Sequence, residues 1–305
     1  MTHRTAGGRR AARRTLLKTL PALVLAAAGS TGPLRRLGAE EPDPERGPYR
    51  FGVFPYLPAL KIDAIFGPVA ASLSRDLGTP IHLRTKPTFE QFAEELAKES
   101  YDIIFVHPFF YVDAHDRYGY LPVARLDEPL RAVLMVPEDS PVRELSDLRG
   151  QTVALPPPLA GVNEMTRMAL LHAGLNPDRD VTVRHYRTKM SCLQAVAMGS
   201  AVACGVPNFL LDQLNGLDGM KLRPLFETPA ISHMVYAVHG RVPEADRRML
   251  RNCIVGWSGT SEGEKIMSIG AWTRFVDARD EDYDEARRYR KRLRLHAVTL
   301  RHARG

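Results

Sequence analysis

The first half of the chain alternates short apolar runs with longer amphipathic ones. The apolar runs fit buried strands, and they cover residues 49–55, 81–85 and 101–106. Between them, apolar residues recur at helical spacing in residues 62–77 and 89–98, and Gly78 ends the first of these helices. Another helix begins at Phe109, Phe110 and Tyr111. The alternation predicts a mostly parallel sheet with helices on both faces.

The same rhythm restarts after residue 130. Strand-like runs cover residues 131–136, 152–155, 181–183 and 201–206, with helical runs at 142–148, 163–173 and 191–198. Residues 233–238 fit a return strand, and helices follow from Glu244. Two α/β units predict a two-lobed protein, with residues 40–130 and 240–305 in the first lobe and 131–239 in the second. Ligands of such sheets bind at the carboxyl ends of strands.

The formal charge of +7 belongs to the N-terminal segment. Residues 1–39 hold eight basic residues and no acidic one, so the rest of the chain carries one net negative charge. A nucleic-acid partner is therefore not expected. A second basic run, from Arg287 to Arg304, fits a solvated helix end; a membrane or partner patch is the alternative.

Residues 1–39 also have the organisation of a removable targeting segment. Arg13 and Arg14 precede an apolar stretch at residues 20–28 that is too short to span a bilayer. With Leu16 and Lys18 behind them, the paired arginines are typical of a twin-arginine signal, which exports folded proteins. The sequence predicts a periplasmic protein, and no later apolar run reaches the roughly 18 residues of a membrane span.

Composition and cysteine usage narrow the class further. A chain of 305 residues with 44% hydrophobic and 25% charged residues can bury a substantial core, which excludes disordered and fibrous proteins. Cys192, Cys204 and Cys253 are too scattered for a metal knuckle. Each fits a buried thiol, and a bridge between Cys192 and Cys204 is the alternative in an oxidising compartment.

Six strings along the chain resemble the substrate-binding proteins of phosphonate, phosphite and phosphate ABC transporters, within the type II periplasmic-binding class. They occur in the family's order, at residues 51–56, 101–108, 145–154, 168–175, 193–199 and 275–283. The resemblance implies two α/β lobes joined by two crossing strands that act as a hinge, with the ligand trapped by closure.

The resemblance also implies an anion site on backbone amides at a helix N-terminus in the second lobe. The corresponding stretch, residues 156–163, contains no Ser or Thr, whereas family members are rich in hydroxyls there. The amides of Ala160, Gly161, Val162 and Asn163 remain as donors. The Asn163 side chain is either a further donor or the helix N-cap.

Other candidate ligand residues stand where strands end. Tyr56 follows the first strand, His107 follows the third, and Tyr111 lies on the helix after it. Lys189 provides a charge for an anion, and the resemblance aligns a family histidine with Lys189 or its neighbour. Asn208 with Phe209 completes the rim. With these aromatic residues the cleft suits a ligand with an organic moiety.

The sequence predicts an exported solute-binding protein, most simply a monomer, that serves a membrane permease. A ligand sensor or assembly partner of a membrane protein is the alternative. The nucleotide-binding and metalloprotease motifs are missing, so catalytic residues, metal ligands and cofactors are not expected. Nor is stable membrane insertion once the signal is removed.

Overall fold

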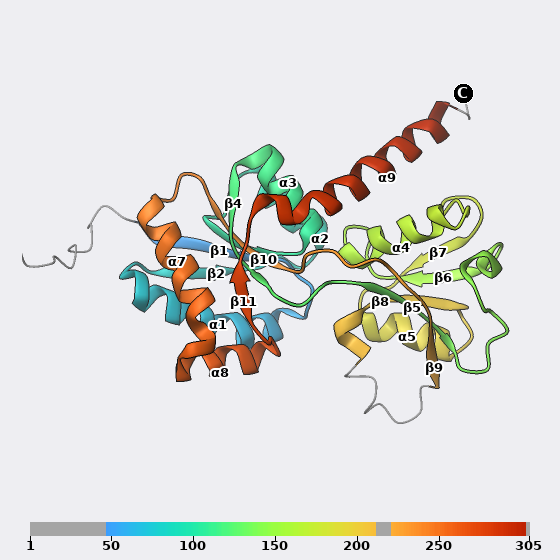
Figure 1. Ribbon diagram of the computed structural model, residues 1–305, viewed down its shortest axis with the longest axis horizontal. Coiled ribbons are helices and arrows are strands. Elements are labelled where there is room, and N and C mark those ends of the chain that lie inside the picture. Colours follow the sequence, from blue (N-terminus) through green and yellow to red (C-terminus); the bar gives the residue numbers. More distant parts are fainter. Residues whose placement is uncertain (1–46, 212–220, 303–305) are drawn as a thin grey trace, which may run out of the picture. The chain divides into compact units, whose positions relative to one another are not determined.

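Two β-sheets flanked by helices organise the chain (Figure 1). The computed structural model describes residues 47–211 and 221–302, with side chains up to Leu293. The predicted signal at residues 1–39 lies outside the described residues.

The first sheet has six strands in the order β11-β4-β10-β3-β1-β2. Strand β1 pairs in parallel with β2 and β3, whereas β10 and β11 run antiparallel to their neighbours, so the sheet is mixed. The strands are β1 (Tyr49–Val53), β2 (Ile81–Arg84), β3 (Ile103–Val106), β4 (Tyr120–Leu126), β10 (Val235–His239) and β11 (Phe275–Asp277). Its helices are α1 (Ala59–Leu77), α2 (Phe89–Ala97), α3 (Pro108–Tyr118), α7 (Glu244–Gly256) and α8 (Ser261–Gly270).

The second sheet has five strands in the order β7-β6-β8-β5-β9. Strand β6 is parallel to β7 and β8, and β5 is antiparallel to β8 and β9. The strands are β5 (Ala132–Pro137), β6 (Thr152–Leu155), β7 (Thr182–His185), β8 (Ala203–Pro207) and β9 (Leu222–Glu227). Helices α4 (Gly161–His172) and α5 (Lys189–Ala197) pack on it. Short 3-10 turns are η1 (Leu145–Leu148), η2 (Asn208–Leu210), η3 (Trp257–Gly259) and η4 (Asp280–Tyr283).

Two segments cross between the sheets. One follows β4 at residues 127–131, the other precedes β10 at residues 228–234, and an isolated bridge joins them at Leu130 and Ile231. The predicted boundary of the second lobe at residue 239 needs a correction, because β10 lies between β3 and β4 in the first sheet. The return strand itself was predicted.

The first sheet packs around an aromatic core. Phe105 is fully buried, with its ring centroid 4.7 Å from that of Tyr236 and 5.0 Å from that of Phe66. Phe66 belongs to a stripe of buried residues at helical spacing on α1, which is why that segment is helical. Gly78 then ends the helix at φ 66°, a left-handed conformation that glycine adopts without strain.

In the second sheet, helices lie unusually close to the strands. A Cβ on Gly205 of β8 would come within 2.7 Å of the Thr166 hydroxyl of α4, so only glycine fits.

Cys192 of α5 and Cys204 of β8 form a disulfide, with their Cα atoms 5.9 Å apart, while Cys253 is a partly buried free thiol. The bridge that the sequence left open is therefore present.

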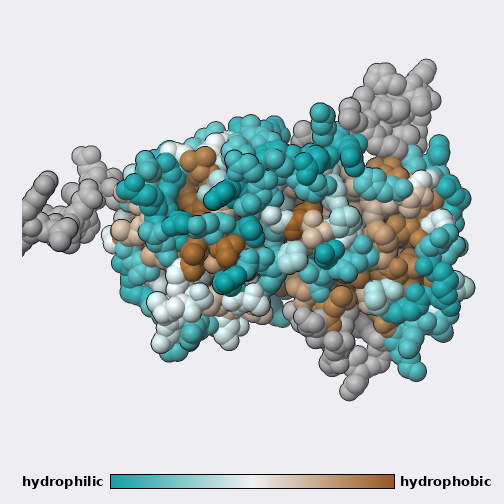
Figure 2. All heavy atoms as spheres, in the orientation of Figure 1, coloured by the Kyte–Doolittle hydropathy of each residue, from teal (hydrophilic) through white to brown (hydrophobic). Residues whose placement is uncertain are grey.

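The surface is mixed in character. Hydrophilic residues cover much of the face drawn in Figure 2, with apolar residues showing between them. Of the helices in the described part of the chain, none combines the length and the apolar character that crossing a bilayer requires.

Candidate functional site

Lys189 brings together aromatic side chains from both sheets. It is the first residue of α5, a helix capped by the Thr188 hydroxyl, which accepts a hydrogen bond from the Ser191 amide. The Lys189 ammonium lies 4.5 Å from the ring centroid of Phe209, which follows β8, and 5.7 Å from that of Tyr56, which follows β1. Two predicted ligand residues thus face each other across the two halves of the molecule.

Lys189 is a partly buried residue. Burial lowers its pKa to about 8, so the side chain is still mostly protonated at neutral pH. Within the described ranges, no carboxylate forms an ion pair with it. A desolvated charge held only by two ring faces is a strong attractor for an anion.

His233 adds a second donor from the crossing segment that precedes β10. Its ring is 3% exposed, and Nδ1 accepts a hydrogen bond of 2.8 Å from the Met234 amide. The proton of the neutral imidazole is therefore on Nε2, which has no hydrogen-bond partner in residues 47–211 and 221–293. Burial, together with the nearby charge of Lys189, lowers the pKa of His233 to about 3, so the ring is neutral at physiological pH.

Tyr236 on β10 carries another buried donor, near Tyr56. Its side chain is fully buried, and its hydroxyl has no hydrogen-bond partner among the described residues. Burial raises its pKa well above the usual range, and the nearby Tyr56 hydroxyl adds to this. Lys189, Tyr56, Phe209, His233 and Tyr236 are referred to below as the Lys189 cluster.

The predicted backbone cradle is packed against the first half of the molecule. Helix α4 begins at Gly161 with Ala160 as the N-cap, so the N-cap alternative for Asn163 is wrong. A Cβ added to Gly161 would lie 3.3 Å from the Phe109 ring and 3.4 Å from Nδ1 of His107. The amides of Gly161 and Val162 therefore stand at an end of α4 that is covered by α3.

Asn163 holds the loop before α4 in place. Its Nδ2 lies 3.2 Å from the Pro156 carbonyl, 3.3 Å from the Pro157 carbonyl and 2.8 Å from Nε2 of His185. Its Oδ1 is buried without a hydrogen-bond partner. The side chain thus fixes residues 156–160 instead of extending toward Lys189.

His107 joins the two halves directly. Its Nε2 lies 3.0 Å from the Leu159 carbonyl in the loop before α4, and Nδ1 accepts from the Phe110 amide at 3.4 Å as the N-cap of α3. Burial lowers the pKa of His107 to about 3, so it is a neutral donor to Leu159. Both ring nitrogens are thus engaged within the protein.

Two further predicted ligand residues have other partners. The Tyr111 hydroxyl donates to Asp280 at 2.8 Å, and its ring packs on Tyr283. Asn208 accepts from the Arg131 amide at 2.9 Å and donates to the Pro129 carbonyl at 3.1 Å, tying the end of β8 to a crossing segment. Because these polar groups are already bonded, neither side chain belongs to the Lys189 cluster.

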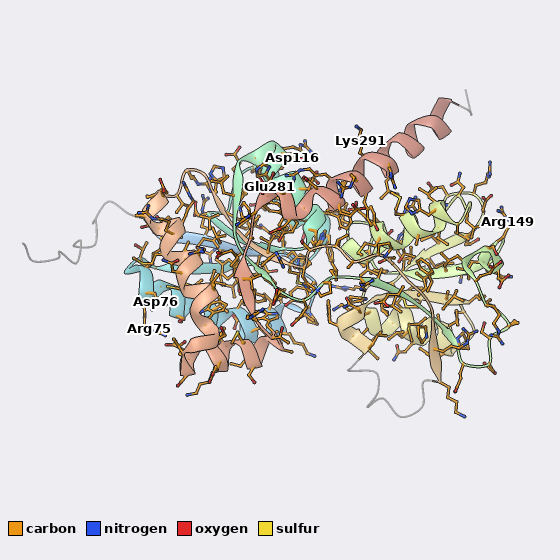
Figure 3. All side chains as sticks on the ribbon, viewed as in Figure 1. Arg75, Asp76, Asp116, Arg149, Glu281 and Lys291 are labelled. Atoms are coloured by element: carbon orange, nitrogen blue, oxygen red, sulfur yellow. A yellow bond between two sulfur atoms is a disulfide. The ribbon has the colours of Figure 1, made fainter. Side chains whose placement is uncertain are left out.

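The C-terminal basic run is not a solvated helix end throughout. Helix α9 (Asp284–His302) packs along both α3 and α4, which belong to different sheets (Figure 1). Near its start, Arg287 donates to Asp116 of α3 at 2.9 Å; Figure 3 shows Asp116 beside this part of α9, and Lys291 pointing outward.

Arg290 of α9 lies between carboxylates of the two helices. Its Nε and Nη2 donate to the two oxygens of Glu164 on α4 at 3.0 and 2.9 Å, and Nη1 donates to Asp113 on α3. The Arg290 side chain is only 14% exposed. This bidentate, largely desolvated contact, referred to below as the Arg290 bridge, links the first turn of α4 to the other half of the molecule.

Surface hollows lie elsewhere. One of about 420 Å³ is lined by Arg125, Asp127, Val276, Asp277, Arg279 and Asp282. Another of about 480 Å³ lies at the C-terminal end of α4, next to Arg292 of α9. Neither includes a predicted site residue. In the part of the chain with described side chains, no cluster of three or more His, Cys, Asp or Glu is placed to hold a metal ion.

His233 and Tyr236 had no signal in the sequence beyond their place in an apolar run that was predicted as a strand. A polar residue in a run that is otherwise buried is the one feature that could have indicated them, because such a group needs a partner. Arg290 was hidden within a run of similar arginines.

Comparisons with known proteins agree with this architecture. The family model described as the periplasmic substrate-binding protein of phosphonate ABC transporters matches residues 51–283. No curated protein sequence matches the chain.

Solved structures share the fold at low sequence identity. With PhnD1 from Prochlorococcus marinus in complex with methylphosphonate, the TM-score is 0.72 at 14% identity, over 81% of this chain and 98% of that chain. A binding protein component of an ABC phosphonate transporter from Pseudomonas aeruginosa gives 0.69 at 14%, over 81% and 86%. The aliphatic sulphonate binding protein SsuA from Escherichia coli gives 0.56 at 17%, over 84% and 93%. The predicted two-lobed α/β fold class is confirmed.

Replacing Arg290 by Met should destabilise the protein by about 2–4 kcal/mol, because two carboxylates lose the guanidinium between them while staying largely buried. Urea unfolding followed by circular dichroism measures the change. The control is Arg288→Met, since Arg288 is 59% exposed and pairs with Glu285 one turn away; its effect should stay within about 0.5 kcal/mol. Equal effects of the two substitutions would contradict a structural role for the bridge.

Proposed function

The chain belongs to the family of periplasmic substrate-binding proteins of phosphonate ABC transporters, and from that membership we propose that it captures a small organic anion between its two lobes for delivery to an ABC permease. Membership confirms the resemblance seen in six strings of the sequence. It also places the chain among ligand-binding transport components rather than enzymes.

The observation that carries the proposal is the Lys189 cluster. Its polar groups are the ammonium of Lys189, the Nε2–H of His233 and the hydroxyl of Tyr236, all able to donate. Within the part of the chain that the structure describes, the imidazole and the phenol have no hydrogen-bond partner and the ammonium has no paired carboxylate. The chemical complement of such a set is a group rich in acceptors with a negative charge.

The placement of these residues supports capture by closure. Tyr56 follows a strand of the first sheet, Lys189 begins a helix on the second, and His233 lies on a crossing segment. A ligand bound among them contacts both lobes and the hinge together. It therefore favours the closed arrangement over an open one by its additional contacts.

The relatives support an oxyanion on an organic body. PhnD1 is in complex with methylphosphonate, and SsuA is named for aliphatic sulphonates. This chain keeps the fold, and the resemblance aligns a family histidine with Lys189 or its neighbour. We extend the proposal to a monomer that works with a permease, since one chain contains every residue of the cluster.

Substituting Lys189 by Met should weaken anion binding by roughly a hundredfold, because the one charge facing the ligand is lost while the apolar stem stays. Isothermal titration with a panel of alkyl and aryl sulfonates, carboxylates and phosphonates measures the affinity. Lys189→Arg should retain most of it, since the charge is kept.

The matched control is Lys221→Met, which removes an exposed lysine just before β9. Its affinity and melting temperature should equal those of the unaltered protein. If no anion of the panel raises the melting temperature of the unaltered protein, capture of an organic anion is wrong.

We also propose that residues 1–39 direct export by the twin-arginine route. The support is the order of Arg13, Arg14, Leu16 and Lys18 before the apolar stretch. Replacing Arg13 and Arg14 together by Lys should leave the protein in the cytoplasmic fraction. Cell fractionation with immunoblotting measures this. The same change at the upstream pair Arg9 and Arg10 is the control, and equal loss of export from both would count against the assignment of the motif.

A further inference from the structure

We propose that the ligand is a singly charged organic anion, a sulfonate or carboxylate with an apolar or aromatic body, held by Lys189 and His233 and not by the amides of α4. This inference rests on the proposed function, because it specifies the ligand class of the same cleft.

The charge available in the cluster is a single positive one. Lys189 is the cation, and His233 is neutral because burial and the neighbouring ammonium keep it unprotonated. Arg131, on the first crossing segment, is held by Glu227 and the Thr228 carbonyl. Arg290 is held by Glu164 and Asp113. A dianion in this cluster would leave a second negative charge buried without a partner, which is costly.

Neutral donors complete the coordination of a monoanion. Among the described residues, the buried Nε2–H of His233 and the buried hydroxyl of Tyr236 have no hydrogen-bond partner. A sulfonate or carboxylate oxygen accepts such bonds without requiring another cation. The His233 ring lies 5.6 Å from the Phe209 ring that also contacts Lys189, so its donor is the one on which the proposal rests.

The backbone amides of α4 do not add to this set. The amide of Ala160 donates to the Pro157 carbonyl and that of Asn163 to the Ala160 carbonyl, at 2.9 Å each. At Gly161 a Cβ would come within 3.3 Å of the Phe109 ring, so α3 lies close to this end of α4. The loop itself has no hydroxyl, since residues 156–163 contain neither Ser nor Thr. A site built to neutralise a phosphonate dianion would need those donors.

Aromatic faces surround the charge. The Tyr56 ring is stacked on that of Phe54, with centroids 4.7 Å apart and planes within 15°. Phe209 lies against both the Lys189 ammonium and the His233 ring, whose centroid is 5.6 Å away. An anion on Lys189 would carry its organic body onto these rings, where apolar surface is buried favourably.

The test compares ligands with the same body and different charge. The full-length protein is titrated calorimetrically with methyl, ethyl and phenyl sulfonates, the corresponding carboxylates, and the corresponding phosphonates. Titrations run from about pH 5.5 to 7.5, where the charged form of Lys189 and the neutral form of His233 both predominate. Tyr56 and Tyr236, the other titratable groups facing the site, stay neutral because burial raises the pKa of each.

Sulfonates should bind with nearly constant affinity across this range. Each phosphonate should lose affinity relative to its sulfonate by roughly twofold to fourfold between about pH 5.5 and 7.5, because the monoanionic fraction of the phosphonate falls over this range. A phosphonate whose affinity relative to its sulfonate stays constant or rises toward about pH 7.5 overturns the monoanion inference and leaves the proposed function standing. If none of the three classes binds, the proposed function fails as well.

A second measurement separates binding by His233 from a purely structural role. His233→Phe removes the donor and keeps a ring, and His233→Gln keeps a donor. The first should weaken sulfonate binding by roughly tenfold and the second by less, with unliganded melting temperatures measured for both. Equal affinity of His233→Phe and the unaltered protein overturns the role of His233.

Discussion

The contact between the two halves of the molecule depends on one guanidinium group, which comes from a helix outside both sheets. Arg290 comes from the last helix of the chain and is paired with Glu164 on one side and Asp113 on the other. Removing three charged groups from water is unfavourable, and it is offset here by bidentate geometry and by pairing on both sides. The same contact fixes the first turn of α4 beside α3, where His107 reaches the Leu159 carbonyl.

The Lys189 cluster is assembled from segments that are remote in sequence. Tyr236 lies in the first sheet and Tyr56 just after one of its strands. Lys189 and Phe209 lie beside the second sheet. The cluster is complete only when both halves of the molecule are in place. That is the property expected of a site that senses a ligand through closure.

The sequence predicted the strands and helices whose periodicity is simple, including β6 at its observed bounds. It missed β4 and β9, which contain Pro122 and Pro224, residues that argue against a strand, and the three-residue β11. The sheets are mixed and not mostly parallel because β10 and β5, two strands that the sequence did predict, run antiparallel to β3 and β8.

Strand-end reasoning put Tyr56 among the candidate residues, because parallel strands deliver side chains to a common edge, and the family resemblance put Lys189 there. It could not show which group each side chain would bond with in the folded protein. The Tyr111 hydroxyl is bonded to Asp280, 169 residues away, and the Asn208 side chain to a crossing segment.

The disulfide between Cys192 and Cys204 anchors α5, the helix that begins at Lys189. Thiols stay reduced in the cytoplasm, so the covalent anchor of that helix exists only in an oxidising compartment. The disulfide that anchors the helix carrying Lys189 therefore forms only where the surroundings are oxidising.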